Sequence, residues 1–215
     1  MERVIAYIDG YNLYYGIKEG FSGRYKWLDL VRLSNLFLTK SQRLEKVKYF
    51  TADISSNNPK MARQKIFLNA LECHCGDMLE ITKGHYLKKE IHCTTYQHTR
   101  EKKRILPQCI NYYNKCCNGI LNIPEEKKTD VNIATSILMD CFQNHFDTVF
   151  LISADSDLVP PLQAIKLLTP QKKIVVLFPP SRGSSELRQL IGHQQCRSIK
   201  EKHLKQSQLP ATVYT

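Results

Sequence analysis

The residues of this sequence best suited to chemistry are carboxylates that directly follow apolar runs. Asp9 follows the run at 4–8, and Asp155 and Asp157 follow a second run at 148–152. Asp130 stands at the start of a helical pattern that precedes the second run. Clustered carboxylates repel one another, and a cation relieves that repulsion. Because all-oxygen ligands favour hard ions, these acids predict a Mg²⁺ or Mn²⁺ site.

The charge balance indicates which substrate such an ion would act on. The 215 residues carry 31 Lys and Arg against 20 acids, a net charge of +11. The segment 83–128 alone has ten basic residues against four acids, and so holds +6 of that surplus. Basic surface attracts polyanions and releases their counterions, although a merely solvated surface is the alternative. A hard ion in basic surroundings suits phosphodiester hydrolysis by a metal-activated water.

Each candidate also has a purely structural explanation. Asp9 with the glycine that follows it can form a turn, and Asp130 and Asp157 can cap helices. Asn12 and Ser153 flank the same positions and can hydrogen-bond a water, a phosphate or a carboxylate. Their structural alternatives are a helix cap and a strand-end hydroxyl. The argument for a site therefore depends on the conjunction of acids after the two most apolar runs.

The surrounding pattern predicts an α/β fold. Strands are expected at 4–8, 47–52, 148–152 and 173–178, a less regular one at 78–91 and an edge strand at 196–199. Helices are expected at 11–18, 28–38, 58–72, 129–145 and 158–168, and from 184 or 185. This alternation is typical of a mainly parallel sheet with helices on both faces. Ligands bind such sheets at the carboxyl ends of strands where the strand order reverses. If the strands at 4–8 and 148–152 are neighbours there, Asp9, Asp155 and Asp157 would converge, and Asp130 could reach the same rim.

One domain over 1–200 is expected, with a basic, cysteine-rich insertion at about 92–124 and a loose polar tail at 201–215. The sequence contains no internal repeat, Gly-rich phosphate loop or dinucleotide motif. No apolar run approaches the length of a membrane span, and the first residues do not form a cleavable signal. We therefore expect a cytoplasmic protein without a membrane partner.

The insertion suggests two further sites. Basic residues beside Tyr96, Tyr112 and Tyr113 suit single-stranded RNA, because cations follow the backbone while aromatic rings stack on bases. These basic residues are Arg100, Lys102, Lys103 and Arg104. A solvated charge run with packed tyrosines is the alternative. Four cysteines are candidates for a structural Zn²⁺, but the sequence lacks the C-x-x-C pairs of a zinc ribbon, so free thiols are the alternative. They are Cys93, Cys109, Cys116 and Cys117.

Three segments in order resemble the NYN domain family, a PIN-like nuclease group that includes LabA-like bacterial proteins. They are IDGYN at 8–12, EKKTDVNIA at 126–134 and ISADSDLVP at 152–160. The resemblance spans about 3–199 and implies a PIN-like three-layer α/β/α sandwich with a Mg²⁺- or Mn²⁺-dependent acidic site acting on RNA. It assigns the acidic set to Asp9, Asp130, Asp155 and Asp157, and it matches Asn12 and Ser153 to polar family positions.

The chain departs from the family pattern at Ala154 and Lys128, where the family usually has glycine. Alanine is tolerated unless that position needs a positive φ. Lys128 adds a cation close to Asp130, which can hold phosphate or weaken metal binding.

The leading hypothesis is a metal-dependent ribonuclease. The four acids would hold the metal, directly or through water, and the substrate would contact Asn12, Ser153, Lys128 and the basic insertion. The alternatives are an RNA-binding regulatory module without turnover and a DNA-directed nuclease. A phosphatase for small substrates fits less well, because it would leave the basic surface without a role.

Overall fold

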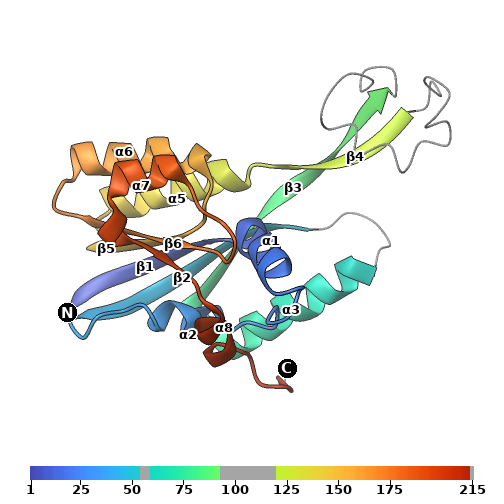
Figure 1. The fold of residues 1–215 in the computed structure, drawn as a ribbon, viewed down its shortest axis with the longest axis horizontal. Helices are drawn as coiled ribbons and strands as arrows, with labels where there is room; N and C mark the ends of the chain where they lie inside the picture. Colours follow the sequence, from blue (N-terminus) through green and yellow to red (C-terminus); the bar gives the residue numbers. More distant parts are fainter. Residues whose placement is uncertain (54–58, 93–119, 214–215) are drawn as a thin grey trace.

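A seven-stranded sheet forms the centre of the computed structural model, which describes residues 1–53, 59–92 and 120–213, with the backbone alone at 85–92 and 120–126. The strand order is β4-β3-β2-β1-β5-β6-β7; six strands run parallel, and β4 runs antiparallel to β3 (Figure 1). The strands are β1 Glu2–Asp9, β2 Gln42–Ala52, β3 Leu79–His92, β4 Ile120–Lys127, β5 Thr148–Ile152, β6 Lys173–Phe178 and β7 Cys196–Ser198. The predicted mainly parallel α/β sheet is confirmed.

Helices cover both faces of this sheet, as expected from the way that successive strand residues point to opposite sides. The helices are α1 Gly10–Gly20, α2 Leu30–Asn35, α3 Pro59–Cys75, α5 Thr129–Phe142, α6 Val159–Leu168, α7 Ser185–Ile191 and α8 Glu201–Gln206. Short 3₁₀ turns are η1 Gly76–Met78, η4 Ser156–Leu158 and η5 His193–Gln195. Val4, Ala6 and Ile8 of β1 pack on the side of α1, α2, α3 and α8. Ile5 and Tyr7 pack on the side of α5, α6 and α7.

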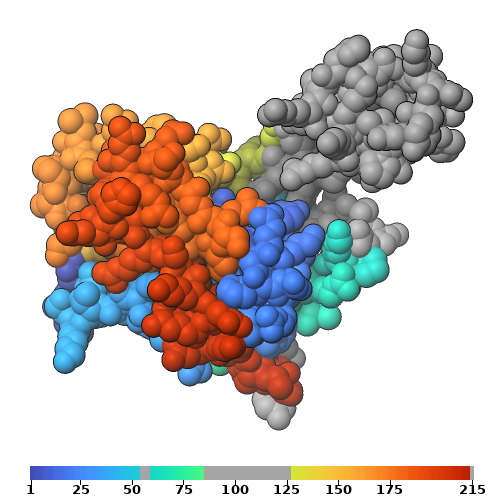
Figure 2. Space-filling model, in the orientation of Figure 1, coloured from blue at the N-terminus to red at the C-terminus, as the bar shows by residue number. Residues whose placement is uncertain are grey.

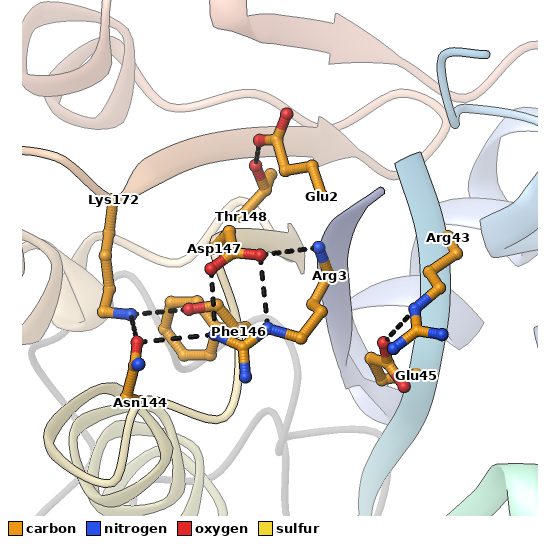
Figure 3. Close-up of polar contacts among 9 residues, drawn as sticks. All are labelled: Glu2, Arg3, Arg43, Glu45, Asn144, Phe146, Asp147, Thr148 and Lys172. Atoms are coloured by element: carbon orange, nitrogen blue, oxygen red, sulfur yellow. Dashed lines mark hydrogen bonds and ion pairs between the residues drawn. The ribbon is translucent and has the colours of Figure 1, made fainter. Parts of the chain in front are cut away.

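Polar contacts hold β1 beside β5 at the end of the sheet opposite the acids (Figure 3). The Arg3 guanidinium donates to both carboxylate oxygens of Asp147, and the Arg3 backbone N–H also donates to Asp147. Next to this pair, Lys172 Nζ donates to Asn144 Oδ1 at 2.7 Å and to the Phe146 carbonyl at 2.5 Å. The register places Ile8 opposite Ile152, so both strands end at the same edge.

A second polar network lies between the sheet and α5. Asp140, which is 5% exposed, accepts hydrogen bonds from Tyr7 Oη at 2.5 Å and from Lys48 Nζ at 2.6 Å. His145 Nδ1 lies 3.0 Å from its other oxygen. Burial would raise the pKa of Asp140, but the hydrogen bonds from Lys48, Tyr7 and His145 outweigh it and lower the pKa. This network joins α5 to β1 and β2, and so helps to fix the helix that carries Asp130.

The structure differs from the sequence expectations at two places. Residues 120–127 form β4, although an irregular segment was expected to 124, because β4 depends on backbone pairing with β3 rather than on an apolar pattern of its own. Residues 201–206 form α8, and Leu204 and Leu209 are buried where a loose tail was expected. Two isolated leucines in a polar sequence give no periodic signal, so only their packing shows the order. Smaller differences are a shorter helix at 30–35 and a β2 that begins at Gln42.

Candidate active site

The candidate site lies where β1 and β5 end side by side. Asp9 is the last residue of β1 and is 4% exposed. Ser153 and Asp155 follow the end of β5, and Ser153 is fully buried. The chain continues from β1 outward to β2 on one side, whereas β5 lies on the other side, so the strand order reverses here. The prediction that these two strands are neighbours is confirmed.

Local hydrogen bonds hold the Asp9 carboxylate in place. Its Oδ1 accepts the Asn12 backbone N–H at 2.9 Å, so Asp9 caps α1. Its Oδ2 accepts the Ser153 hydroxyl at 2.9 Å, and the same hydroxyl accepts the Asp155 N–H at 3.1 Å. The Asn12 side chain does not cap α1 and instead accepts the Ala154 N–H at 3.2 Å. Asn12 and Ser153 thus connect the end of β1 to the segment after β5.

Asp130 approaches this pair from the first turn of α5. One carboxylate oxygen each from Asp9, Asp130 and Asp155 lies within 4.8 Å of the other two. Asp130 does not cap its helix: the residue at the cap position is Lys128, whose side chain makes no capping bond. Lys128 has a φ of +78°, in the left-handed region, so the chain turns sharply between β4 and α5.

Two glycines allow the close approaches around the site. A Cβ at Gly10 would lie 2.6 Å from the Phe50 carbonyl oxygen, and a Cβ at Gly84 would lie 2.8 Å from Thr129 Oγ1. That hydroxyl is buried and has no hydrogen-bond partner among the described residues. Sequence reasoning gave Gly10 only a possible place in a turn and assigned no role to Gly84. A glycine within a strand pattern, as at Gly84, is the signal that can reveal such an approach.

The electrostatics of the site reflect like charges held close together. Burial raises the pKa of Asp130, and the negative charges of Asp155 and Asp157 raise it further. Asp157 itself is exposed and lies outside the group of three; its backbone N–H donates to Asp155 Oδ1 at 3.0 Å. The structure therefore brings Asp130 together with Asp9 and Asp155 and leaves Asp157, which was expected in the converging group, at the exposed rim.

This arrangement fits a hard divalent cation. The three side chains offer only carboxylate oxygens, the donors that Mg²⁺ and Mn²⁺ prefer. A cation between them would offset the repulsion that raises the pKa of Asp130. The donor set differs from a zinc site, which in proteins uses mainly Cys and His ligands.

The other residues singled out in the sequence lie partly inside and partly outside the described part of the chain. Lys128 lies exposed at the start of α5. Ala154 is not among the residues with positive φ, so alanine replaces the family's usual glycine there without backbone strain. The basic residues at 100 and 102–104 and the zinc candidates at 93, 109, 116 and 117 lie outside the described residues. Free thiols in the described part are Cys73, Cys75, Cys141 and Cys196.

The fold and the acidic group together define a PIN-like domain, and the chain belongs to the NYN domain family, whose model matches residues 3–193. NYN domains form a PIN-like nuclease family that acts on nucleic acid, typically with divalent metals. Within the described residues, no helix is both long and apolar enough to cross a membrane.

Two individual proteins are similar to this chain. The first is a protein of Pseudomonas putida (strain DSM 28022 / S16) named 6-hydroxy-3-succinoylpyridine 3-monooxygenase HspA. Its sequence is 28% identical to this chain over 233 aligned positions. The match covers 98% of this chain and 71% of that protein. The other is a crystal structure of a protein of unknown function from Vibrio parahaemolyticus RIMD 2210633, with a TM-score of 0.55 and 18% identity. It covers 93% of this chain and 94% of its own, and it supports the fold alone.

Proposed function

We propose that this protein is a Mg²⁺- or Mn²⁺-dependent ribonuclease. The observation that carries the proposal is the group of Asp9, Asp130 and Asp155 oxygens, within 4.8 Å of one another at the carboxyl edge of the sheet. Membership of a PIN-like nuclease family supports the reaction class. The net charge of +11 supports a polyanionic substrate.

The three carboxylates have different surroundings, and we assign them different roles. A bound ion would supply an activated water and neutralise charge on the phosphate. Asp9 is buried and held by two hydrogen bonds, so it provides a fixed ligand. Asp130, in the first turn of α5, completes the group with Asp155, and one of these acids would accept the proton that the attacking water loses. Asp157, at the exposed rim, would contact the ion through water. Lys128 is exposed two residues before Asp130, where it can contact a phosphate.

The experiment compares cleavage of single-stranded RNA and DNA of the same sequence with Mn²⁺, with Mg²⁺ and with EDTA. We expect metal-dependent RNA cleavage that Asp155→Asn reduces by at least about 100-fold, since the substitution removes a charged ligand. The matched control is Asp77→Asn, a change at an exposed aspartate outside the group. Cleavage that survives both EDTA and Asp155→Asn would come from a contaminant and would refute the proposal.

Two other outcomes correspond to the alternatives. Salt-sensitive RNA binding that persists in Asp155→Asn, with no cleavage by the wild type, would identify a binding module on a PIN-like scaffold. Preferential cleavage of DNA would identify a DNA-directed nuclease, since the same acids serve either substrate.

The relative named as a monooxygenase suggests a further candidate, and the donor set argues against an iron-dependent oxygenase at this site. Non-haem iron oxygenases typically bind iron through two histidines and one carboxylate, whereas this group has three carboxylates. We therefore expect no O₂ uptake when the protein is mixed with 6-hydroxy-3-succinoylpyridine, a reductant and Fe²⁺. Uptake that depends on Asp130 would favour the oxygenase instead.

A further inference from the structure

Helix α1 presents aromatic rings to solvent directly beside the acidic group. Its buried face is formed by Leu13, Gly16 and Ile17. Tyr14 and Tyr15 point away from that face, and their residues are 39% and 43% exposed. Tyr11, which is half-buried, completes what we call the tyrosine face: Tyr11, Tyr14 and Tyr15. Figure 2 shows part of the surface of the α1 region, in blue, open to solvent.

The tyrosine face begins at the candidate site and leads away from it. Asp9 caps α1, and the Tyr11 hydroxyl donates to the carbonyl of Ala52, at the end of β2. The Tyr11 and Tyr15 rings are stacked, with centroids 6.4 Å apart and an interplanar angle of 26°. Tyr14 meets Tyr15 edge-on at 5.3 Å. At a rise of about 1.5 Å per residue, Tyr15 lies about 9 Å along the helix from Asp9.

Cations accompany these rings. Lys26 Nζ lies 4.4 Å from the centroid of the Tyr14 ring, and Lys18 Nζ lies 5.9 Å from that of Tyr15. The neighbouring acid, Glu19, is already paired with Arg182 at 2.5 Å. The surface therefore combines exposed aromatic rings with positive charge.

Close packing holds α1 in position. A Cβ at Gly16 would lie 2.7 Å from the Pro180 carbonyl oxygen, and one at Gly20 would lie 2.9 Å from Ser181 Oγ. The helix is thus seated directly on the segment that follows β6. After the helix, Ser22 and Tyr25 both have positive φ, in the turn that returns the chain to Lys26 beside Tyr14. A surface ordered in advance binds a flexible ligand at lower entropic cost.

We propose that the tyrosine face is a stacking platform for the bases of single-stranded nucleic acid that enters the acidic group. The inference rests on the proposed nuclease function and adds a surface on α1 that contacts the bases of the substrate. Aromatic rings stack on unpaired bases of any sequence, while lysines follow the phosphates. Bases within a duplex are already stacked on one another and are not available to these rings. The charge of the face matches a polyanion rather than a basic protein partner.

The test measures binding without cleavage, by fluorescence anisotropy of a labelled single-stranded RNA decamer in EDTA. Tyr14→Ala/Tyr15→Ala should raise the dissociation constant by at least about 10-fold, since each stacked base contributes strongly to binding. Tyr14→Phe/Tyr15→Phe keeps the rings and should stay within about 2-fold of wild type. Both residues are exposed, and an unchanged melting temperature will confirm that the alanine variant is folded.

A second ligand separates stacking from charge. An abasic decamer with the same number of phosphates should bind wild type and the alanine variant equally. The platform is refuted if the alanine variant binds the RNA as tightly as wild type does. It is also refuted if the alanine variant loses the same fraction of its affinity for the RNA and for the abasic decamer.

The outcomes also distinguish this inference from the proposed function. Weaker RNA binding by the alanine variant, together with no cleavage by the wild type, would support the platform and refute the nuclease. Metal-dependent cleavage with unchanged binding by the alanine variant would support the nuclease and refute the platform.

Discussion

Replacing Asp130 by asparagine should stabilise the metal-free protein, because the substitution removes one of three neighbouring negative charges. The carboxylate oxygens lie within 4.8 Å of one another. Two unit charges at about this distance repel by about 1 kcal/mol in water and by about 3 kcal/mol at an effective dielectric of 20. Asp130 is only half-buried, so screening favours the lower end. We expect a gain of about 1–2 kcal/mol, or a melting temperature higher by about 2–8 °C.

The pH dependence of this gain follows from the raised pKa of Asp130. A carboxyl group whose pKa is higher in the folded than in the unfolded state destabilises the fold above the folded pKa, where it is ionised. The difference between Asp130→Asn and wild type should therefore be largest at neutral pH. It should shrink as the pH falls toward the ordinary pKa of aspartate, and it should also shrink in high salt.

The assay is thermal unfolding of wild type, Asp130→Asn and the control Asp77→Asn, each with EDTA and with Mn²⁺. Wild type should gain about 2.7 kcal/mol when Mn²⁺ is at 100 times its dissociation constant, and Asp130→Asn should gain much less. The control should behave as wild type in both conditions. If Asp130→Asn is less stable than wild type in EDTA, the repulsion between these carboxylates is refuted. If it keeps the full Mn²⁺ gain, Asp130 does not help to hold the ion.

Two further substitutions, each with a control variant, test how the structure positions α5. Lys128→Gly should raise the free energy of unfolding by about 0.5–1 kcal/mol, because the φ of +78° is strained for lysine. The control Lys127→Gly should lower the free energy of unfolding. A Lys128→Gly variant that melts at a lower temperature than wild type would contradict this prediction. Asp140→Asn should lower the free energy of unfolding in urea by about 3 kcal/mol, because it leaves the Lys48 ammonium buried with weaker pairing. Since the pKa of Asp140 is lowered, its contribution should persist above the ordinary aspartate pKa and disappear only as the pH falls through the folded value. Glu80→Gln, at an exposed partner of the same lysine, should cost less than about 1 kcal/mol, and an equal loss for both variants would contradict the assigned network.

Some elements were predictable because they carry their own signal. The runs at 149–152 and 174–178 are continuously apolar, and the structure has β5 and β6 over those residues. β4 and α8 carry no such pattern, since one depends on backbone pairing with β3 and the other on the burial of isolated leucines. For the same reason their existence could be established only from the structure.

The candidate site was likewise predictable in part from local sequence and in part only from the tertiary structure. The sequence determined which residues stand directly after each apolar strand, because strand length and the change from apolar to polar residues are local properties. It therefore identified Asp9, Asp155 and Asp157 after strands, with Asp130 at the start of a helix, and it predicted the edge of the sheet where they gather, but not which three would form the group. The tertiary structure decided that three converge and that Asp157 stays at the rim. That convergence depends on the pairing of β1 with β5 and on the docking of α5, and such contacts between distant segments leave no trace in local spacing.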